Sequence, residues 1–140
     1  MKILMPVDGS AVAKRMLAYV AVHEELFGRE HDYLAFTAVL PVPTYAARFL
    51  DRAALEAYHR EQAEEVLATV RAYAAQQGWK LRTSWAVGSP AEAIVGCAQA
   101  ENPDLIVMGT HGHSALGNVV LGSVAAGVLA RCKVPVLFVR

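Results

Sequence analysis

The sequence lacks an excess of charge of either sign. Thirteen Lys and Arg residues are balanced by thirteen Asp and Glu residues, so the formal net charge at pH 7 is zero. The broad positive field that draws proteins to nucleic acid is therefore absent, and basic residues are not interleaved with aromatic ones as in single-strand binders. The composition argues against a nucleic acid partner, while a small local phosphate site stays compatible with it.

Long apolar runs and cysteine clusters are also missing. No apolar run reaches the roughly 18 residues of a membrane span, and the apolar stretch of the opening segment MKILMPVDGS is too short for a signal peptide. We therefore expect a cytoplasmic protein without a membrane partner. Cys97 and Cys132 form neither a C-x-x-C redox pair nor a zinc knuckle, so both are expected to be plain thiols.

What the sequence does contain is a regular alternation of apolar runs and helical patterns. Hydrophobic residues make up 55% of the 140 residues and charged residues 19%, which is typical of a sheet covered on both faces. The length suits about one domain, which we expect to span residues 1–140. The alternation predicts an α/β fold with right-handed βαβ units around an open parallel sheet. The five predicted strands are Lys2–Val7, Tyr33–Leu40, Lys80–Val87, Asp104–Met108 and Val134–Val139. The third alternates only partly, as an edge strand does.

Turn and cap residues predict the helices between these strands. Ser10 is expected to cap a first helix that ends at Gly28. The residues expected on the buried stripe of this helix are Val12, Met16, Tyr19 and Phe27. A long helix is predicted within Asp51–Gln77, with its buried stripe formed by Leu55, Tyr58, Val66, Leu67, Val70, Tyr73 and Ala74.

The next predicted helix begins with a capping box, in which Ser89 caps, Pro90 takes the first position and Glu92 reaches back. The last helix is expected to end near Arg131, and a cap at its start is an alternative role for Ser123. The least regular stretches are Pro41–Leu50 and Thr110–Leu121, and the isolated histidines His23, His31 and His59 are expected at the surface.

Two loops are candidates for binding, because ligands of open parallel sheets bind beyond the carboxyl ends of the strands. The loop after the first strand contains Asp8, which also has the alternative role of a helix cap. The loop after the fourth strand contains Gly109 and Gly112, whose backbone can approach a ligand, and Gly122 with Ser123 can open a helix with free amides. Such an arrangement suits a phosphate chain.

Better-known motifs do not fit these residues. The segment Gly117–Ser123 has P-loop glycine spacing but lacks the lysine, and Gly109–Gly112 has the wrong spacing for a dinucleotide fingerprint. Leucine replaces the second glycine of a nucleophile elbow in Gly112–Leu116. The histidines of His111–His113 have no nearby Cys or carboxylate to complete a metal site.

The loop instead resembles the pattern of the universal stress protein family: glycine, two residues, glycine, nine residues, then glycine with serine or threonine. Gly109, Gly112, Gly122 and Ser123 match it without a gap. The segments that extend the resemblance along the chain are KILMPVDGS, GSPAEAIVGCA, NPDLIVMGTHG and KVPVLFVR.

The resemblance implies a Rossmann-like fold of the adenine-nucleotide α-hydrolase type, with sheet order 3-2-1-4-5, and an ATP site with Mg²⁺ accompanying the nucleotide. The residues that it assigns to this site are Pro6, Val7, Asp8, Ala38, Met108, Gly109, His111, Gly112, Gly122, Ser123 and Val124. Asp8 would meet either the ribose or the metal. Ala125 stands where some relatives offer a hydroxyl, so AMP and ADP remain alternatives to ATP.

The resemblance also implies a homodimer formed through the last strand, around Val134, Val136 and Phe138. The function that the resemblance first implies is that of a stress-response regulator, which binds nucleotide with little or no turnover. No residue is assigned a catalytic role. Two alternatives stay open: a slow ATPase using Asp8 and His111, and a nucleotide-free dimeric module that recruits a partner through Pro41–Leu50.

Overall fold

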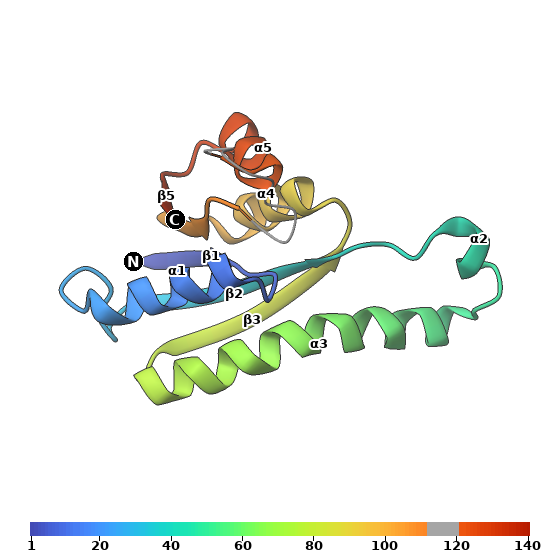
Figure 1. The fold of residues 1–140 in the computed structure, drawn as a ribbon, viewed down its shortest axis with the longest axis horizontal. Coiled ribbons are helices and arrows are strands. Elements are labelled where there is room, and N and C mark those ends of the chain that lie inside the picture. Colours follow the sequence, from blue (N-terminus) through green and yellow to red (C-terminus); the bar gives the residue numbers. More distant parts are fainter. Residues whose placement is uncertain (112–120) are drawn as a thin grey trace.

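A five-stranded parallel sheet organises the molecule (Figure 1). The computed structural model describes residues 1–111 and 121–140. The strands are β1 (Lys2–Pro6), β2 (Asp32–Val39), β3 (Lys80–Val87), β4 (Leu105–Gly109) and β5 (Val136–Val139). Their order, β3-β2-β1-β4-β5, confirms the order that the family resemblance implied, and each lies within two residues of its predicted bounds.

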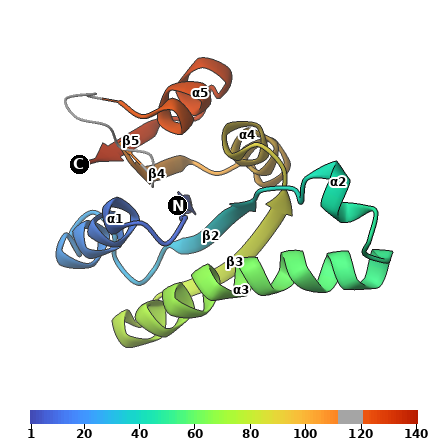
Figure 2. The same ribbon diagram turned by 45° about the vertical axis from the view of Figure 1, so that its right-hand side comes forward.

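Helices cover both faces of this sheet, as the high apolar content predicts. They are α1 (Ala11–Val22), α2 (Thr44–Ala47), α3 (Arg52–Gln77), α4 (Pro90–Glu101) and α5 (Ser123–Arg131). Helices α1 and α3 pack on one face around Met16 and Leu67, while α4 and α5 pack on the other around Ile94 and Val128 (Figure 2). None of the described helices is both long and apolar enough to span a bilayer.

The first helix is shorter than the sequence predicts. It ends at Val22 instead of continuing to Gly28, and the amides of Leu26 and Phe27 both donate to the carbonyl of His23 in the turn that follows. Phe27 nevertheless reaches the core, with 3% of its surface exposed. The apolar spacing therefore identified a buried side chain correctly but assigned it to a helix that had already ended.

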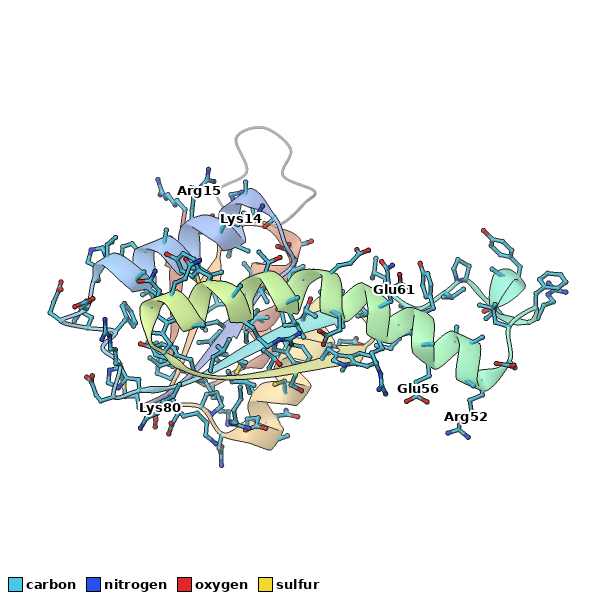
Figure 3. All side chains as sticks on the ribbon, turned by 90° about the horizontal axis from the view of Figure 1, so that it is seen from below. Lys14, Arg15, Arg52, Glu56, Glu61 and Lys80 are labelled. Atoms are coloured by element: carbon cyan, nitrogen blue, oxygen red, sulfur yellow. The ribbon has the colours of Figure 1, made fainter. Side chains whose placement is uncertain are left out.

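The buried stripe of α3 also differs from the prediction. The N-terminal part of α3 extends beyond the sheet together with α2, a short helix within the stretch predicted to be irregular (Figures 1 and 3). Tyr58 is 45% exposed there, whereas His59, expected at the surface, is 8% exposed. The Nε2 atom of His59 has no hydrogen-bond partner among the described residues. Its burial was missed because spacing was counted from apolar residues alone.

The three predicted caps have different outcomes. Ser10 caps α1, accepting a hydrogen bond from the Ala13 amide at 3.2 Å. Ser89 occupies the N-cap of α4 with proline next to it, but its side chain makes no capping hydrogen bond, so the predicted capping box does not form. In α5 the N-cap is Gly122, and Ser123 is the first helical residue instead of the cap.

Candidate functional site

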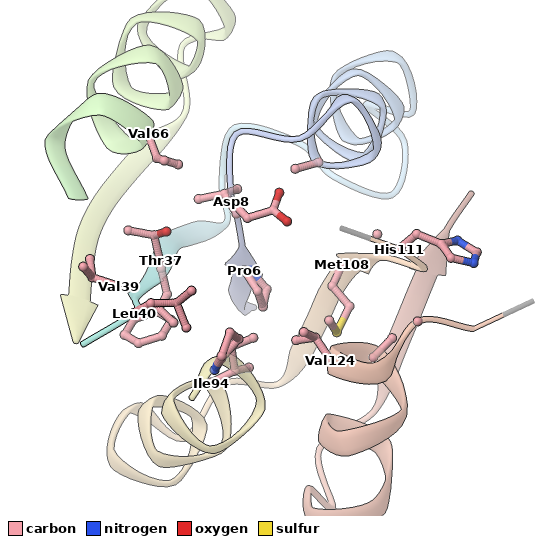
Figure 4. A pocket seen from close by; sticks show the side chains of 18 of the residues that line it. Pro6, Asp8, Thr37, Val39, Leu40, Val66, Ile94, Met108, His111 and Val124 are labelled. Carbon is pink, nitrogen blue, oxygen red and sulfur yellow. The ribbon is translucent and has the colours of Figure 1, made fainter. Parts of the chain in front are cut away.

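A pocket of about 840 Å³ lies at the carboxyl ends of β1, β2 and β4 (Figure 4). From β1 the sheet grows to one side through β2 and β3 and to the other side through β4 and β5. The pocket therefore lies at the point where the strand order reverses. The predicted site residues that line the pocket are Pro6, Val7, Asp8, Ala38, Met108, Gly109, His111, Gly122, Ser123 and Val124. The remaining predicted residue, Gly112, lies outside the described residues. Two sequence segments about a hundred residues apart thus contribute to one cavity.

The loop after β1 places Asp8 in this pocket. The Val7 amide continues the sheet by donating to the Phe36 carbonyl at 2.8 Å, and Gly9 then turns the chain with a φ of +76°. One carboxylate oxygen of Asp8 accepts from the Ser10 amide at 2.9 Å. This bond holds the side chain in place while the carboxylate points into the pocket (Figure 4).

Close packing explains two of the predicted glycines. A Cβ on Gly109 would lie 2.6 Å from Cγ1 of Val12 on α1. A Cβ on Gly122 would lie 2.9 Å from the carbonyl oxygen of Thr110, which accepts a 2.6 Å hydrogen bond from the Gly122 amide. Gly109 therefore leaves room for the Val12 side chain of α1, and Gly122 lets the start of α5 lie against the backbone at the end of β4.

The start of α5 lies at the pocket. Among the described residues no side chain caps this helix, whereas α1 is capped by Ser10. Ser123 and Val124, the first two residues of α5, line the cavity. Uncapped amides at a helix N-terminus, with the positive end of the helix dipole, form a binding site for an anion such as phosphate.

Charged side chains around the pocket are mainly acidic. Its described lining includes the carboxylates of Asp8 and Glu65 but neither lysine nor arginine, and the sequence of residues 112–120 contains neither. A phosphate chain would therefore be neutralised by backbone amides and by a cation that it brings. The described residues contain no group of three or more His, Cys, Asp or Glu able to hold a metal alone. Asp8 fits Mg²⁺ in the usual way, as one carboxylate beside phosphate oxygens and water.

His111 lies on the β4 side of the cavity. Its Nδ1 atom is 2.9 Å from the hydroxyl of Thr110, which is itself buried. The Thr110 amide donates to the Val139 carbonyl at the end of β5. The residue before His111 is thus held to β5 through its amide and to the start of α5 through its carbonyl, which accepts from the Gly122 amide.

The predictions missed the wall that α3 adds to the pocket. Tyr58, Gln62, Glu65 and Val66 line it from this helix, and Thr37 lines it from β2. Strand ends and glycine patterns could not point to α3, because its residues follow neither a strand end nor a glycine pattern. Thr37 could have been predicted from the sequence, because it is the polar residue in the apolar and aromatic run Tyr33–Leu40.

Comparison with known proteins places this chain in a family. The Universal stress protein family profile matches residues 1–140. The Thermus aquaticus universal stress protein encoded in the QAH/OAS sulfhydrylase 3' region is 38% identical, over 99% of this chain and 97% of the relative. The structure of Methanocaldococcus jannaschii hypothetical protein MJ0577 has a TM-score of 0.82 at 29% identity, covering 99% and 94%. A universal stress protein in complex with cAMP has a TM-score of 0.67 at 26% identity, covering 100% and 96%.

Proposed function

The chain belongs to the universal stress protein family, and from this premise we propose that its pocket binds an adenine nucleotide, ATP in particular, in a regulatory role with little or no turnover. The observation that carries the proposal is the uncapped start of α5, which faces the Asp8 loop at the reversal of strand order. The relative crystallised with cAMP supports the choice of an adenine nucleotide.

The residues divide between the parts of such a ligand. The phosphates would lie against the amides of Ser123 and Val124. Asp8 would hold either the ribose hydroxyls or a phosphate-bound Mg²⁺, and both fit an exposed carboxylate at the mouth of β1. Ala38 and Met108 provide apolar surface and backbone for the adenosine. Bound Mg²⁺ would supply charge neutralisation of the phosphate chain.

The charge of the pocket favours binding over phosphoryl transfer. Transfer enzymes stabilise the charge of the moving phosphoryl group with lysine, arginine and metal ions. The described lining offers Asp8 and His111 but neither of the two permanently cationic side chains. The enzymatic alternative is slow ATP hydrolysis that uses Asp8 and His111. It would be established by ATP turnover that is abolished in Asp8→Ala and also in His111→Ala.

Proline substitution at Ser123 tests the role of α5 directly. Ser123 is the first helical residue, a position that accepts proline, and the φ and ψ of Gly122 (−71° and 164°) suit a residue before proline. Ser123→Pro removes one amide donor and the hydroxyl, whereas Ser123→Ala removes the hydroxyl alone. We expect Ser123→Pro to weaken ATP–Mg²⁺ binding by about tenfold or more in calorimetry, the effect of one hydrogen bond to a charged group. Ser123→Ala should lose less.

Two results would contradict the proposal. One is unchanged ATP affinity in Ser123→Pro. The other is wild-type protein that carries no nucleotide in native mass spectrometry and stays empty at millimolar ATP and Mg²⁺. An empty protein would favour the nucleotide-free interaction module, for which the exposed Tyr45 (67%) and Phe49 (82%) of the segment Pro41–Leu50 are the supporting observation.

We also propose that two copies pair through β5. This strand is an edge of the sheet and pairs with β4 on one side. The carbonyl of Pro135 accepts from the Ile106 amide of β4, and the carbonyl of Val139 accepts from the amide of Thr110, the residue after β4. Because backbone groups alternate in direction along a strand, those of Val136 and Phe138 point away from β4. Outward-pointing donors and acceptors on an edge strand are a template for pairing with a second copy.

A further inference from the structure

A projecting segment borders the pocket. Residues 41–51, here called the arm, connect β2 to α3 and contain α2 (Figure 1). The arm leaves the body of the molecule after Leu40 and rejoins it in the first turns of α3, where Tyr58 lies. Both Leu40 and Tyr58 line the pocket, so any movement of the arm changes how open the pocket is.

Hydrogen bonds hold the arm to the rest of the molecule only at its ends. Within the arm, the Ala47 amide donates to the Pro43 carbonyl at 2.9 Å. At its far end, the Asp51 side chain accepts from the Ala54 amide at 2.7 Å, in the first turn of α3. Among the described residues no hydrogen bond or ion pair joins residues 41–51 to a strand. The arm can therefore move without breaking a hydrogen bond of the sheet.

Apolar packing holds the arm no more firmly. No residue from 40 to 58 is buried, although this stretch includes α2 and the first turns of α3. The first buried residue of α3 is His59, and its Nε2 atom has no hydrogen-bond partner among the described residues. A segment with few buried contacts opens and closes at a low cost in free energy, and an unsatisfied buried atom at its base lowers this cost further.

The surface that the arm exposes is apolar. Phe49 is 82% exposed and Tyr45 67%, and Leu40 at the base of the arm is 68% exposed. Large apolar side chains gathered in one exposed segment mark a surface that a ligand or a partner covers. Because the arm borders the pocket at both of its ends, the ligand of that pocket is the nearest molecule that can cover it.

The arm also carries the positive charge that the pocket lacks. The described lining of the pocket contains neither lysine nor arginine. Arg48 lies over the Phe49 ring, 5.9 Å from its centroid, and neither Arg48 nor Arg52 has an ion-pair partner among the described residues. An anionic ligand in the pocket would therefore attract the arm.

We propose that the arm is a lid, which closes over the pocket when the nucleotide binds. The inference rests on the proposed nucleotide function. The arm pivots at Leu40 and at the junction of α2 with α3, so that Tyr45 and Phe49 leave the solvent and Arg48 approaches the bound anion. Closure excludes water from the ligand and removes an apolar patch from the surface, which gives nucleotide binding an effect that a partner protein can detect.

Trypsin reports the position of the arm, because it cleaves after Arg48 and Arg52. Cleavage at both sites is followed by peptide mass spectrometry with and without ATP and Mg²⁺. We expect saturating nucleotide to slow cleavage at both sites by about tenfold or more, since a closed arm is not a substrate. Arg29 is the internal control. It is exposed in the turn before β2, at the opposite end of the sheet, so its cleavage should change little.

A double variant tests the contact between arm and ligand. Tyr45→Ser, Phe49→Ser removes two exposed aromatic side chains, so urea unfolding should stay unchanged. We expect this variant to bind ATP–Mg²⁺ about tenfold less tightly in calorimetry. Val22→Ser, Leu26→Ser is the matched control, because it removes apolar side chains that are 72% and 55% exposed at the other end of the sheet. That control should bind as wild type does.

The outcomes separate the lid from the function on which it rests. Where calorimetry shows ATP bound, unchanged cleavage at Arg48 and Arg52 overturns the lid and leaves nucleotide binding intact. Equal slowing at Arg29 also overturns it, because the ligand then stabilises the whole molecule instead of closing the arm. Wild-type affinity in Tyr45→Ser, Phe49→Ser has the same meaning. A wild type that binds no ATP in calorimetry overturns the proposed function itself.

Discussion

At the residue scale, Gly122 is a position where one added carbon atom would disturb the contact between α5 and β4. A Cβ at this position would press on the Thr110 carbonyl and break the hydrogen bond between the two residues. We expect Gly122→Ala to lower the free energy of unfolding by about 1–3 kcal/mol, as overpacking does, and to weaken ATP binding by about tenfold or more. Urea unfolding and calorimetry measure the two effects.

Gly96→Ala is the matched control for this substitution. Gly96 lies inside α4, and an added Cβ would have no described atom from outside its own helix turn within 4 Å. Alanine there should raise the free energy of unfolding by about 0.5–1 kcal/mol, because glycine is a poor helix former. Unchanged stability of Gly122→Ala would show that the start of α5 can shift away from β4 without loss.

The surroundings of Cys97 favour the protonated form of its thiol. Burial, reinforced by the nearby Glu101 carboxylate, raises the pKa of the Cys97 thiol from 9.0 to about 11. The thiolate is the reactive form, so at pH 8 we expect iodoacetamide to modify Cys97 roughly tenfold or more slowly in the folded protein than in urea. Peptide mass spectrometry over time measures this. Equal rates would show that the thiol is not shielded.

The same pKa shift links Cys97 to stability. The unfolded thiol ionises near pH 9.0, while the folded thiol keeps its proton to about pH 11. The unfolded state therefore releases this proton first as the pH rises, and the contribution of Cys97 to stability is lost across that interval.

Residues that line the pocket were predictable where they follow a strand end or belong to the glycine pattern. Asp8, Gly109 and Gly122 lie at strand ends and in a glycine pattern, and the structure brings them to one cavity. Thr37 and Glu65 were not predicted, because a side chain on a strand or helix becomes a pocket residue only through the packing of α3 on β2. That packing depends on contacts between distant segments, which spacing does not encode.

At the scale of single elements, two serines at helix starts make a direct comparison. Ser10 and Ser89 are both N-cap residues, but only Ser10 accepts a hydrogen bond from its helix. We expect Ser10→Ala to lower the free energy of unfolding by about 1 kcal/mol and Ser89→Ala to change it by much less. Urea unfolding of both variants checks the difference. An equal loss would mean that the cap of α4 forms in solution after all.

Strands were more predictable than helix ends. Parallel strands buried on both faces are continuous apolar runs, so their bounds follow from composition alone. Helix ends depend on what the helix meets: α1 ends before Phe27 because the turn at His23 delivers that ring to the core. Tyr58 stays 45% exposed while its neighbour His59 is buried, because Tyr58 lies on the side of α3 that borders the open pocket.

At the scale of the whole molecule, strand order was the feature that patterns left open. Alternating strands and helices predict a parallel sheet but not which strands are neighbours. The family resemblance supplied the order, and with it the position of the cavity between β1 and β4.

The proposed pairing of two molecules is tested at Val136. Its amide points away from β4, so Val136→Pro removes a donor from the open edge without removing a bond of the sheet. We expect dimeric wild type and monomeric Val136→Pro in native mass spectrometry, with Val136→Thr, which keeps the amide and the shape, still dimeric. Monomeric wild type, or a dimeric proline variant, would rule out β5 as the contact.

The central place of β1 also affects how the protein is made. Residues 2–87 contain three adjacent strands, β1, β2 and β3, which can assemble as soon as they leave the ribosome. The other edge of β1 waits for β4, which ends about 20 residues after β3, a delay of roughly 1 to 4 s at ordinary rates of synthesis. During that interval the most central strand of the finished sheet is an open edge, so nascent chains shorter than about 110 residues are the ones that most need a chaperone.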